Sequence, residues 1–87
     1  MTYGIKFKKS SLKELECLER KTQQKIISAI ESLTLCPTPH GSLKLTAPVP
    51  LWRIRVGSYR VLYEINNDVL IIHVIKIVHR KDAYRGI

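Results

Sequence analysis

The sequence predicts a single α+β domain spanning residues 1–87, in the order β-αα-βββ, with an αα-hairpin packed on one face of an antiparallel sheet. Apolar residues repeat at helical spacing in the first half of the chain and alternate at strand spacing from residue 51 onward. A proline-rich segment separates these two regions, and 87 residues suffice for one domain with one core.

The N-terminal part is predicted to contain one strand and two helices. Residues 3–8 alternate apolar and lysine side chains, which is the pattern of a half-buried strand. Ser11 followed by Glu14 has the spacing of a capping box, so Ser11 is expected to start the first helix. Thr22 is expected to cap the second helix, and Pro37 to end it, because proline disfavours a helical residue before it.

The C-terminal part is predicted to form three consecutive strands. Gly57-Ser58 is a two-residue hairpin turn, and Asn67-Asp68 lies in a second turn. Residues 37–50 hold all four prolines and are expected to be a loop or a short extended passage. The strands are expected at 51–56, 59–66 and 69–79, with the last one apolar on both faces and therefore central in the sheet.

Composition limits the classes of function. Basic residues outnumber acidic ones by 15 to 7, giving a net charge of +8, and residues 1–50 (8 basic, 4 acidic) carry as much of it as residues 51–87 (7 basic, 3 acidic). This indicates a polyanionic partner, although a basic soluble surface explains it too. No apolar run is long enough to span a membrane, and no secretory signal is recognisable. The two cysteines and three histidines are scattered, so we expect no metal and no cofactor, and a cytoplasmic protein.

The predicted hairpin places like charges opposite each other. A two-residue turn sets Arg55 against Arg60, with Arg53 on the same face and Glu64 as the one carboxylate of the hairpin on that face. Directly opposed like charges destabilise a sheet. Guanidinium groups bind phosphate bidentately, so the missing anion is interpreted as a ligand; a solvated outer sheet face is the alternative.

The second turn decides which part of the last strand joins this face. A two-residue loop at Asn67-Asp68 would direct His73 and His79 to the arginine side. A three-residue loop at 66–68 would instead bring Lys76 and Arg80 there. The sequence leaves this choice open.

Two segments, WRIRVGSYRVLYEI and VIKIVHRKDAYR, resemble the RelE branch of the RelE/ParE toxin superfamily, whose β-αα-βββ layout covers nearly the whole chain. The resemblance implies a cytoplasmic toxin of a type II toxin–antitoxin system. It implies an endoribonuclease, or mRNA interferase, that cuts mRNA in the ribosomal A site by 2′-OH attack without a metal. It also implies an acidic RelB-like antitoxin as partner.

By the same resemblance, residue by residue, the catalytic positions fall on Arg53, Arg55, Arg60, Arg80 and Tyr84. Studied members of the family often have lysine at the first two of these positions. Arginine stays protonated and is a poor general base, so the site would rely on charge stabilisation and positioning. Tyr84 would stack on a base, and His79 is the nearby side chain whose ordinary pKa suits acid–base catalysis.

Two other functions remain possible from the sequence. A ParE-like toxin of the same fold would inhibit DNA gyrase by protein contact and needs no catalytic basic cluster. A non-catalytic module would bind nucleic acid or an antitoxin. The density of Arg53, Arg55, Arg60 and Arg80, together with Tyr84, speaks against the ParE-like toxin.

Overall fold

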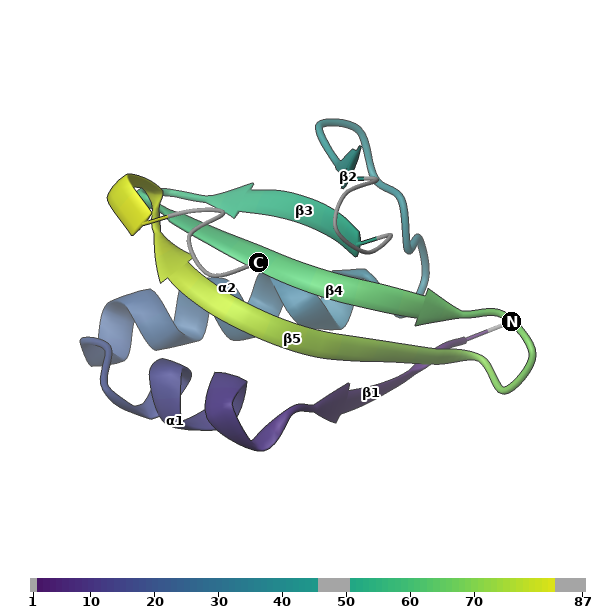
Figure 1. The fold of residues 1–87 in the computed structure, drawn as a ribbon, viewed down its shortest axis with the longest axis horizontal. Helices are drawn as coiled ribbons and strands as arrows, with labels where there is room; N and C mark the ends of the chain where they lie inside the picture. Colours follow the sequence, from purple (N-terminus) through teal and green to yellow (C-terminus); the bar gives the residue numbers. More distant parts are fainter. Residues whose placement is uncertain (1, 46–50, 83–87) are drawn as a thin grey trace.

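A computed structural model describes residues 2–45 and 51–82 (Figure 1). Two helices and five strands follow one another along the chain, and a short 3-10 helix ends the described part. The elements are β1 (Gly4–Phe7), α1 (Lys9–Glu16), α2 (Arg20–Ser32), β2 (Leu43–Leu45), β3 (Leu51–Val56), β4 (Tyr59–Asn66), β5 (Ile71–His79) and η1 (Arg80–Asp82).

The strands form one sheet in the order β1-β5-β4-β3-β2. The α+β class and the helix hairpin on one face of the sheet are confirmed (Figure 1). Two details differ from the expected sheet. β2 forms a fifth strand inside the proline-rich segment, and β1 pairs with β5 in parallel, while all other pairs are antiparallel. No short turn joins β1 to β5, because residues 8–70 lie between them, so nothing local forces an antiparallel pairing.

The core lies between the helices and the sheet. One face of the sheet, which we call the helix face, packs against the apolar side of both helices (Figure 1). Burying these side chains supplies most of the favourable free energy of folding. The buried cluster comprises Leu15, Ile26, Ile30, Leu33, Ile54, Val61, Tyr63, Ile72, Val74 and Ile77.

Both predicted helix caps are wrong. α1 begins at Lys9, and Ser11 is buried inside it, where its Oγ donates to the carbonyl oxygens of Lys8 (2.7 Å) and Val74 (3.0 Å). Glu14 does not cap the helix either, since its Oε1 accepts the backbone N–H of Ile77 at 3.0 Å. Ile77 lies beyond the last residue of β5 that pairs with β1, so the Glu14 carboxylate satisfies a backbone group that a neighbouring strand would otherwise pair. The hydrogen bonds of Ser11 and Glu14 to β5 replace the capping box that the local sequence predicts.

The second helix also starts earlier than expected. α2 begins at Arg20 after an N-cap at Glu19 that makes no side-chain capping bond, so Thr22 lies within the helix. Its last helical residue is Ser32, several residues before Pro37. Proline therefore lies beyond the helix end without setting its position.

The turn between β4 and β5 has four residues, 67–70, and both predicted loop lengths are wrong. The Asn66 side chain stabilises it, because its Oδ1 accepts the backbone N–H groups of Asp68 (3.0 Å) and Val69 (3.3 Å). Leu70 adopts φ 55°, a left-handed conformation that is strained for a leucine side chain. This turn sets the register of the second hairpin, β4–β5, as far as the Tyr63–Val74 pair.

A β-bulge then shifts that register within β5. Tyr63 pairs with Val74, but Leu62 pairs with Lys76, so Ile75 is the extra residue. An extra residue reverses which side chains point to which face. His73 therefore lies on the face opposite the helices before the bulge, and Lys76 lies on the same face after it. The two-residue loop alternative was therefore right for His73, and the three-residue loop alternative was right for Lys76.

Candidate functional site

The predicted register of the first hairpin is confirmed. Arg55 pairs with Arg60, and Arg53 pairs with Leu62. The turn depends on Gly57, whose φ of 60° is the conformation that two-residue hairpins require and that glycine adopts without strain. The face of the sheet that carries these three arginines, opposite the helix face, is called the arginine face below.

Arg53 is the least exposed of these side chains, at 6% of its surface. It lies between Leu43 on β2 and Leu62 on β4 in the register of the sheet. Its Nε and Nη1 atoms have no hydrogen-bond partner in the structure of the described residues. Leaving two nitrogens of a buried guanidinium without acceptors costs folding free energy, so this position favours an anion that enters from outside.

Arg55 and Arg60 differ in their surroundings although they are paired. Arg60 is half-buried, and its Nη1 donates to the backbone carbonyl of Tyr59 at 3.1 Å. Arg55 is exposed, and it lines a cavity of about 310 Å³ together with His40 and residues of α2. The sequence had not indicated that His40, from the loop before β2, would lie near this arginine. Their proximity depends on tertiary packing of that loop.

Arg80 lies at the end of β5, beside the first hairpin turn. Its backbone N–H donates to the carbonyl oxygen of Ser58 at 2.7 Å, and its side chain is exposed. This bond fastens the start of η1 to the turn between β3 and β4. The ends of three strands thus bring Arg55, Arg60 and Arg80 to one end of the sheet.

His79 lies on the other face of the sheet. It pairs with Tyr59, whose ring it meets edge-on at 5.3 Å between centroids, and Tyr59 packs against the core on the helix face. Its Nδ1 accepts the backbone N–H of Lys81 at 3.2 Å. The imidazole is therefore separated by the sheet from the Arg55–Arg60 pair, although it is next to Arg80 in sequence.

The structure also places Lys76 on the arginine face. Lys76 pairs with Leu62, in the same row across the strands as Arg53. The bulge places it there, and no pattern in the sequence identified the bulge. Tyr84, the expected stacking residue, lies outside the described residues.

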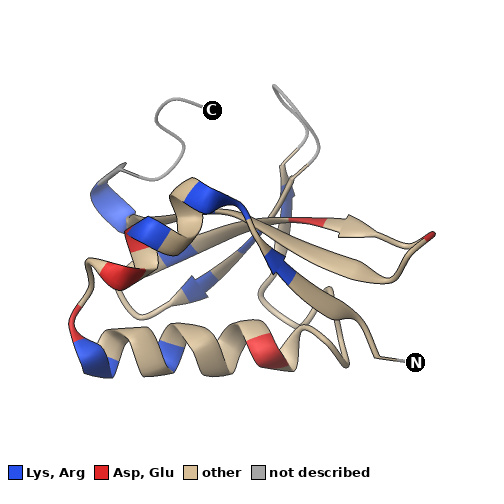
Figure 2. Cartoon of the chain, turned by 90° about the horizontal axis from the view of Figure 1, so that it is seen from below, with Lys and Arg blue, Asp and Glu red and all other residues tan. Residues whose placement is uncertain are grey.

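The basic charge is distributed widely, as expected from the sequence. Figure 2 shows lysine and arginine in both helices and in several strands. Within residues 2–45 and 51–82, no three His, Cys, Asp or Glu side chains form a group that could hold a metal ion. None of the described helices is long and apolar enough to cross a membrane.

Comparisons with known proteins agree on one family. The family model for the ParE toxin of the type II toxin–antitoxin system parDE matches residues 5–84. A candidate toxin called RelE1 from Methanocaldococcus jannaschii is 31% identical over 89 residues, covering 99% of each chain. A crystal structure of an archaeal RelE–RelB complex from Pyrococcus horikoshii OT3 superimposes with a TM-score of 0.81 at 31% identity, covering 95% of this chain and 100% of the other.

Proposed function

Because this chain belongs to the RelE/ParE superfamily of type II toxin–antitoxin toxins, we propose that it cuts messenger RNA in the ribosomal A site. The observation that carries the proposal is the arginine face. Arg55 and Arg60 stand directly opposite each other, beside a buried Arg53 whose Nε and Nη1 have no hydrogen-bond partner within residues 2–45 and 51–82. This arrangement costs folding free energy and is compensated when a phosphate group binds.

The proposed reaction uses the RNA's own nucleophile and no metal ion. The ribose 2′-oxygen attacks the adjacent phosphorus, a new P–O2′ bond forms and the P–O5′ bond breaks. The products are a 2′,3′-cyclic phosphate and a 5′-hydroxyl. The proton of the 2′-OH goes to a base, and the leaving 5′-oxygen receives one proton, so the charge and the atoms balance.

The arginines act on the charge that develops during this reaction. Arg55 and Arg60 are proposed to bind the scissile phosphate and to stabilise the extra negative charge of the phosphorane. Arg80, held beside the hairpin turn, is proposed to bind the same or the next phosphate, and Tyr84 to stack on a base and align the 2′-OH. Arginine does not release its proton, so the proton is taken by another group.

The decisive experiment is the mapping of mRNA 5′-ends after expression, with and without ribosome assembly on the same transcript. Cuts inside translated codons, and none on the free transcript, are the expected result. Cleavage of free RNA would replace the ribosome-dependent proposal with a general ribonuclease. Absence of cuts in both samples would refute the nuclease.

The match to a family model described as ParE supports a second candidate, a toxin that acts on DNA gyrase by protein contact. This candidate predicts DNA damage after expression with intact mRNA. The same cultures can be tested for both, and the two results exclude each other.

An antitoxin partner is part of the proposal. A net charge of +8 fits an acidic protein, and the helices expose apolar side chains, with Leu12 at 43% and Ile27 at 40% of their surface. An acidic RelB-like antitoxin is expected to cover this helix surface and the arginine face in the cytoplasm, with a fast, salt-sensitive association rate. Co-expression with the neighbouring open reading frame should abolish toxicity and yield a co-purified complex. If it does neither, the antitoxin proposal fails.

A further inference from the structure

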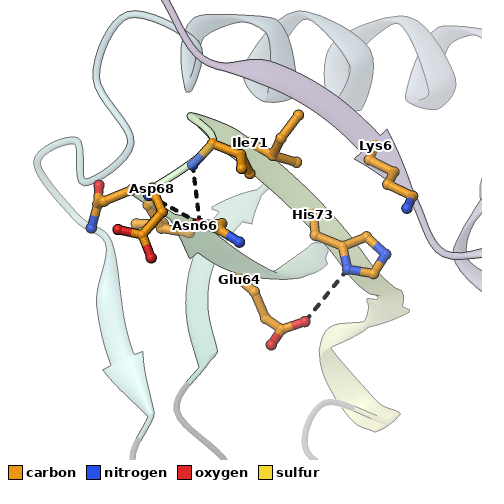
Figure 3. A pocket seen from close by; sticks show the side chains of 9 residues that line it. Lys6, Glu64, Asn66, Asp68, Ile71 and His73 are labelled. Carbon is orange, nitrogen blue, oxygen red and sulfur yellow. Dashed lines mark hydrogen bonds and ion pairs between the residues drawn. The ribbon is translucent and has the colours of Figure 1, made fainter.

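A second polar cluster occupies the arginine face at the end of the sheet distant from the first hairpin. Lys6 on β1 pairs with His73 on β5, and His73 pairs with Glu64 on β4, so the three form one row across adjacent strands. The row borders a cavity of about 660 Å³ that continues to the β4–β5 turn (Figure 3). A cavity of this size is in the range of small-molecule sites.

The groups of this cavity offer both donors and acceptors to a ligand. His73 Nδ1 lies 3.5 Å from Glu64 Oε1, while the Glu64 side chain keeps 52% of its surface exposed (Figure 3). The amide oxygens of Asn66 and Asn67 are already used, the first by the turn and the second by the Tyr3 hydroxyl. The Lys6 ammonium and the Glu64 carboxylate are the charged groups of the row.

A carboxylate is unexpected on a face that binds phosphates. Glu64 is four residues from Arg60 on the same strand and would repel an RNA backbone that follows the sheet. The repulsion becomes an attraction when the carboxylate meets the N–H groups of a base instead of a phosphate. The amino and imino N–H groups of guanine are adjacent and match the two oxygens of one carboxylate.

From this geometry we propose that the Lys6–His73–Glu64 row is a guanine-binding subsite of the RNA, an inference that rests on the proposed nuclease function. Glu64 accepts the guanine N1–H and amino group, Lys6 donates to O6 or N7, and the base lies against the His73 imidazole between them. Adjacent strands are about 4.8 Å apart, so Lys6 and Glu64 stand about 10 Å apart across His73, enough to flank one base.

The distance to the arginines fits a single RNA strand. Four residues along β4 separate Glu64 from Arg60, which corresponds to about 14 Å. That length spans about four nucleotides at the 3.4 Å spacing of a stacked strand, and fewer in an extended one. The subsite would therefore select a base a few nucleotides from the cut.

Binding and cleavage test this subsite separately. GMP and UMP carry the same phosphate, so an NMR titration with each isolates the effect of the base. The amide signals of Lys6, Glu64 and His73 should shift on titration, with a dissociation constant for GMP at least about tenfold lower than that for UMP. Glu64→Gln places an amide donor against the guanine donors and should remove this preference. Asp68→Asn makes the same charge change on the rim of the same cavity and should leave it unchanged.

In the cleavage assay, Glu64→Gln should redistribute cuts away from sites with guanine at one fixed distance from the cut. Wild-type cleavage with an unchanged cut pattern in Glu64→Gln, or equal shifts with GMP and UMP, would overturn the subsite and leave the nuclease intact. GMP-selective shifts in a protein that cuts no mRNA would retain the subsite and refute the nuclease. Shifts of the row with an acidic antitoxin peptide, and none with nucleotides, would assign the cavity to a protein contact and overturn the proposal.

Discussion

The two faces of the sheet differ in how completely their buried polar groups are hydrogen-bonded. On the helix face, the polar groups that are buried have partners: the Tyr63 hydroxyl donates to the Pro37 carbonyl at 2.6 Å, and Ser11 Oγ donates to Val74 and Lys8. On the arginine face, Arg53 is buried with two nitrogens that find no acceptor in the described part of the chain. The hydrogen bonding of the helix face is what folding stability alone would favour, whereas that of the arginine face is not.

We interpret this difference as folding stability exchanged for the proposed binding of a phosphate group. A sequence selected for stability alone would place an apolar side chain at position 53, because Leu62 is completely buried beside it and Leu51 almost completely. Local rules for a stable fold are usually violated at functional sites. The comparison predicts that substitutions on the arginine face lower activity without lowering stability, and that those on the helix face do the reverse.

The largest effect is expected for Arg60→Ala. Loss of a guanidinium that stabilises the phosphorane should lower the cleavage rate about 10²–10³-fold. The thermal midpoint should remain within a few degrees of wild type, because the opposing charge of Arg55 is relieved at the same time. Cleavage of ribosome-bound mRNA and thermal unfolding measure the two quantities.

The matched control for Arg60→Ala is Lys25→Ala, which removes the same charge from an exposed position on α2. It should retain wild-type cleavage within about twofold. Equal losses in both variants would mean that net charge, and not the position of Arg60, controls the rate.

Arg53→Met is expected to have opposite effects on activity and stability. Replacing a buried guanidinium, whose Nε and Nη1 lack a hydrogen-bond partner among the described residues, with an apolar side chain of similar length should raise the free energy of unfolding by about 1–4 kcal/mol. The same change should reduce cleavage, because the anion loses a ligand. Urea unfolding measures the first effect, and Arg55→Met, at an exposed position, should leave stability nearly unchanged. A less stable Arg53→Met would show that the guanidinium is satisfied in solution.

The sequence predicted the elements whose geometry is set locally. A two-residue turn with glycine fixes its own register, so the Arg55–Arg60 pair followed from the position of Gly57-Ser58. The bulge at Ile75 could not be predicted, because it depends on how β5 pairs with β4 and no local residue pattern marks it. The same holds for the cap of α1, where a bond from Ser11 to β5 replaced the local pattern.

The candidate site shows the same division between features that are set locally and features that depend on tertiary structure. The arginines of the first hairpin were placed correctly on one face from strand periodicity, since that rule needs only a register. The face of His79 and the contribution of Lys76 required knowledge of the bulge. The burial of Arg53 required the neighbouring strand β2, which the proline-rich sequence did not identify.

On the helix face, Tyr63→Phe should reduce stability and not activity. The hydroxyl donates to Pro37, and its loss leaves that carbonyl without its partner, at a cost of about 1–2 kcal/mol.

Burial raises the pKa of Tyr63 from 10.0 to about 12, with a further contribution from Cys36. The folded state holds the phenolic proton more tightly than the unfolded state. Tyr63 therefore stabilises the fold fully below pH 10, and this contribution is lost as the pH rises toward 12.

Unfolding free energies measured between pH 9 and 12 test this linkage. Wild type should lose more stability over this range than Tyr63→Phe, and the difference between them should shrink as the pH rises. Tyr3→Phe, which removes a more exposed hydroxyl, serves as the control and should keep the wild-type dependence. Parallel curves for wild type and Tyr63→Phe would contradict the shift.

The smallest effect on cleavage is expected for His79→Gln. His79 contacts Tyr59 on the helix face, so the sheet separates its ring from the Arg55–Arg60 pair. Loss of the edge-on ring contact should cost about 0.5–1.5 kcal/mol of stability, while the cleavage rate and its pH dependence should stay at wild-type values.

His40→Gln is the matched variant, because His40 lines the cavity beside Arg55. Flattening of the rate between about pH 5.5 and 7.5 in His79→Gln would identify it as the acid or base despite its position. Flattening in His40→Gln instead would move that role to the loop before β2, and an unchanged profile in both would assign the proton transfers to the ribosome or to the mRNA.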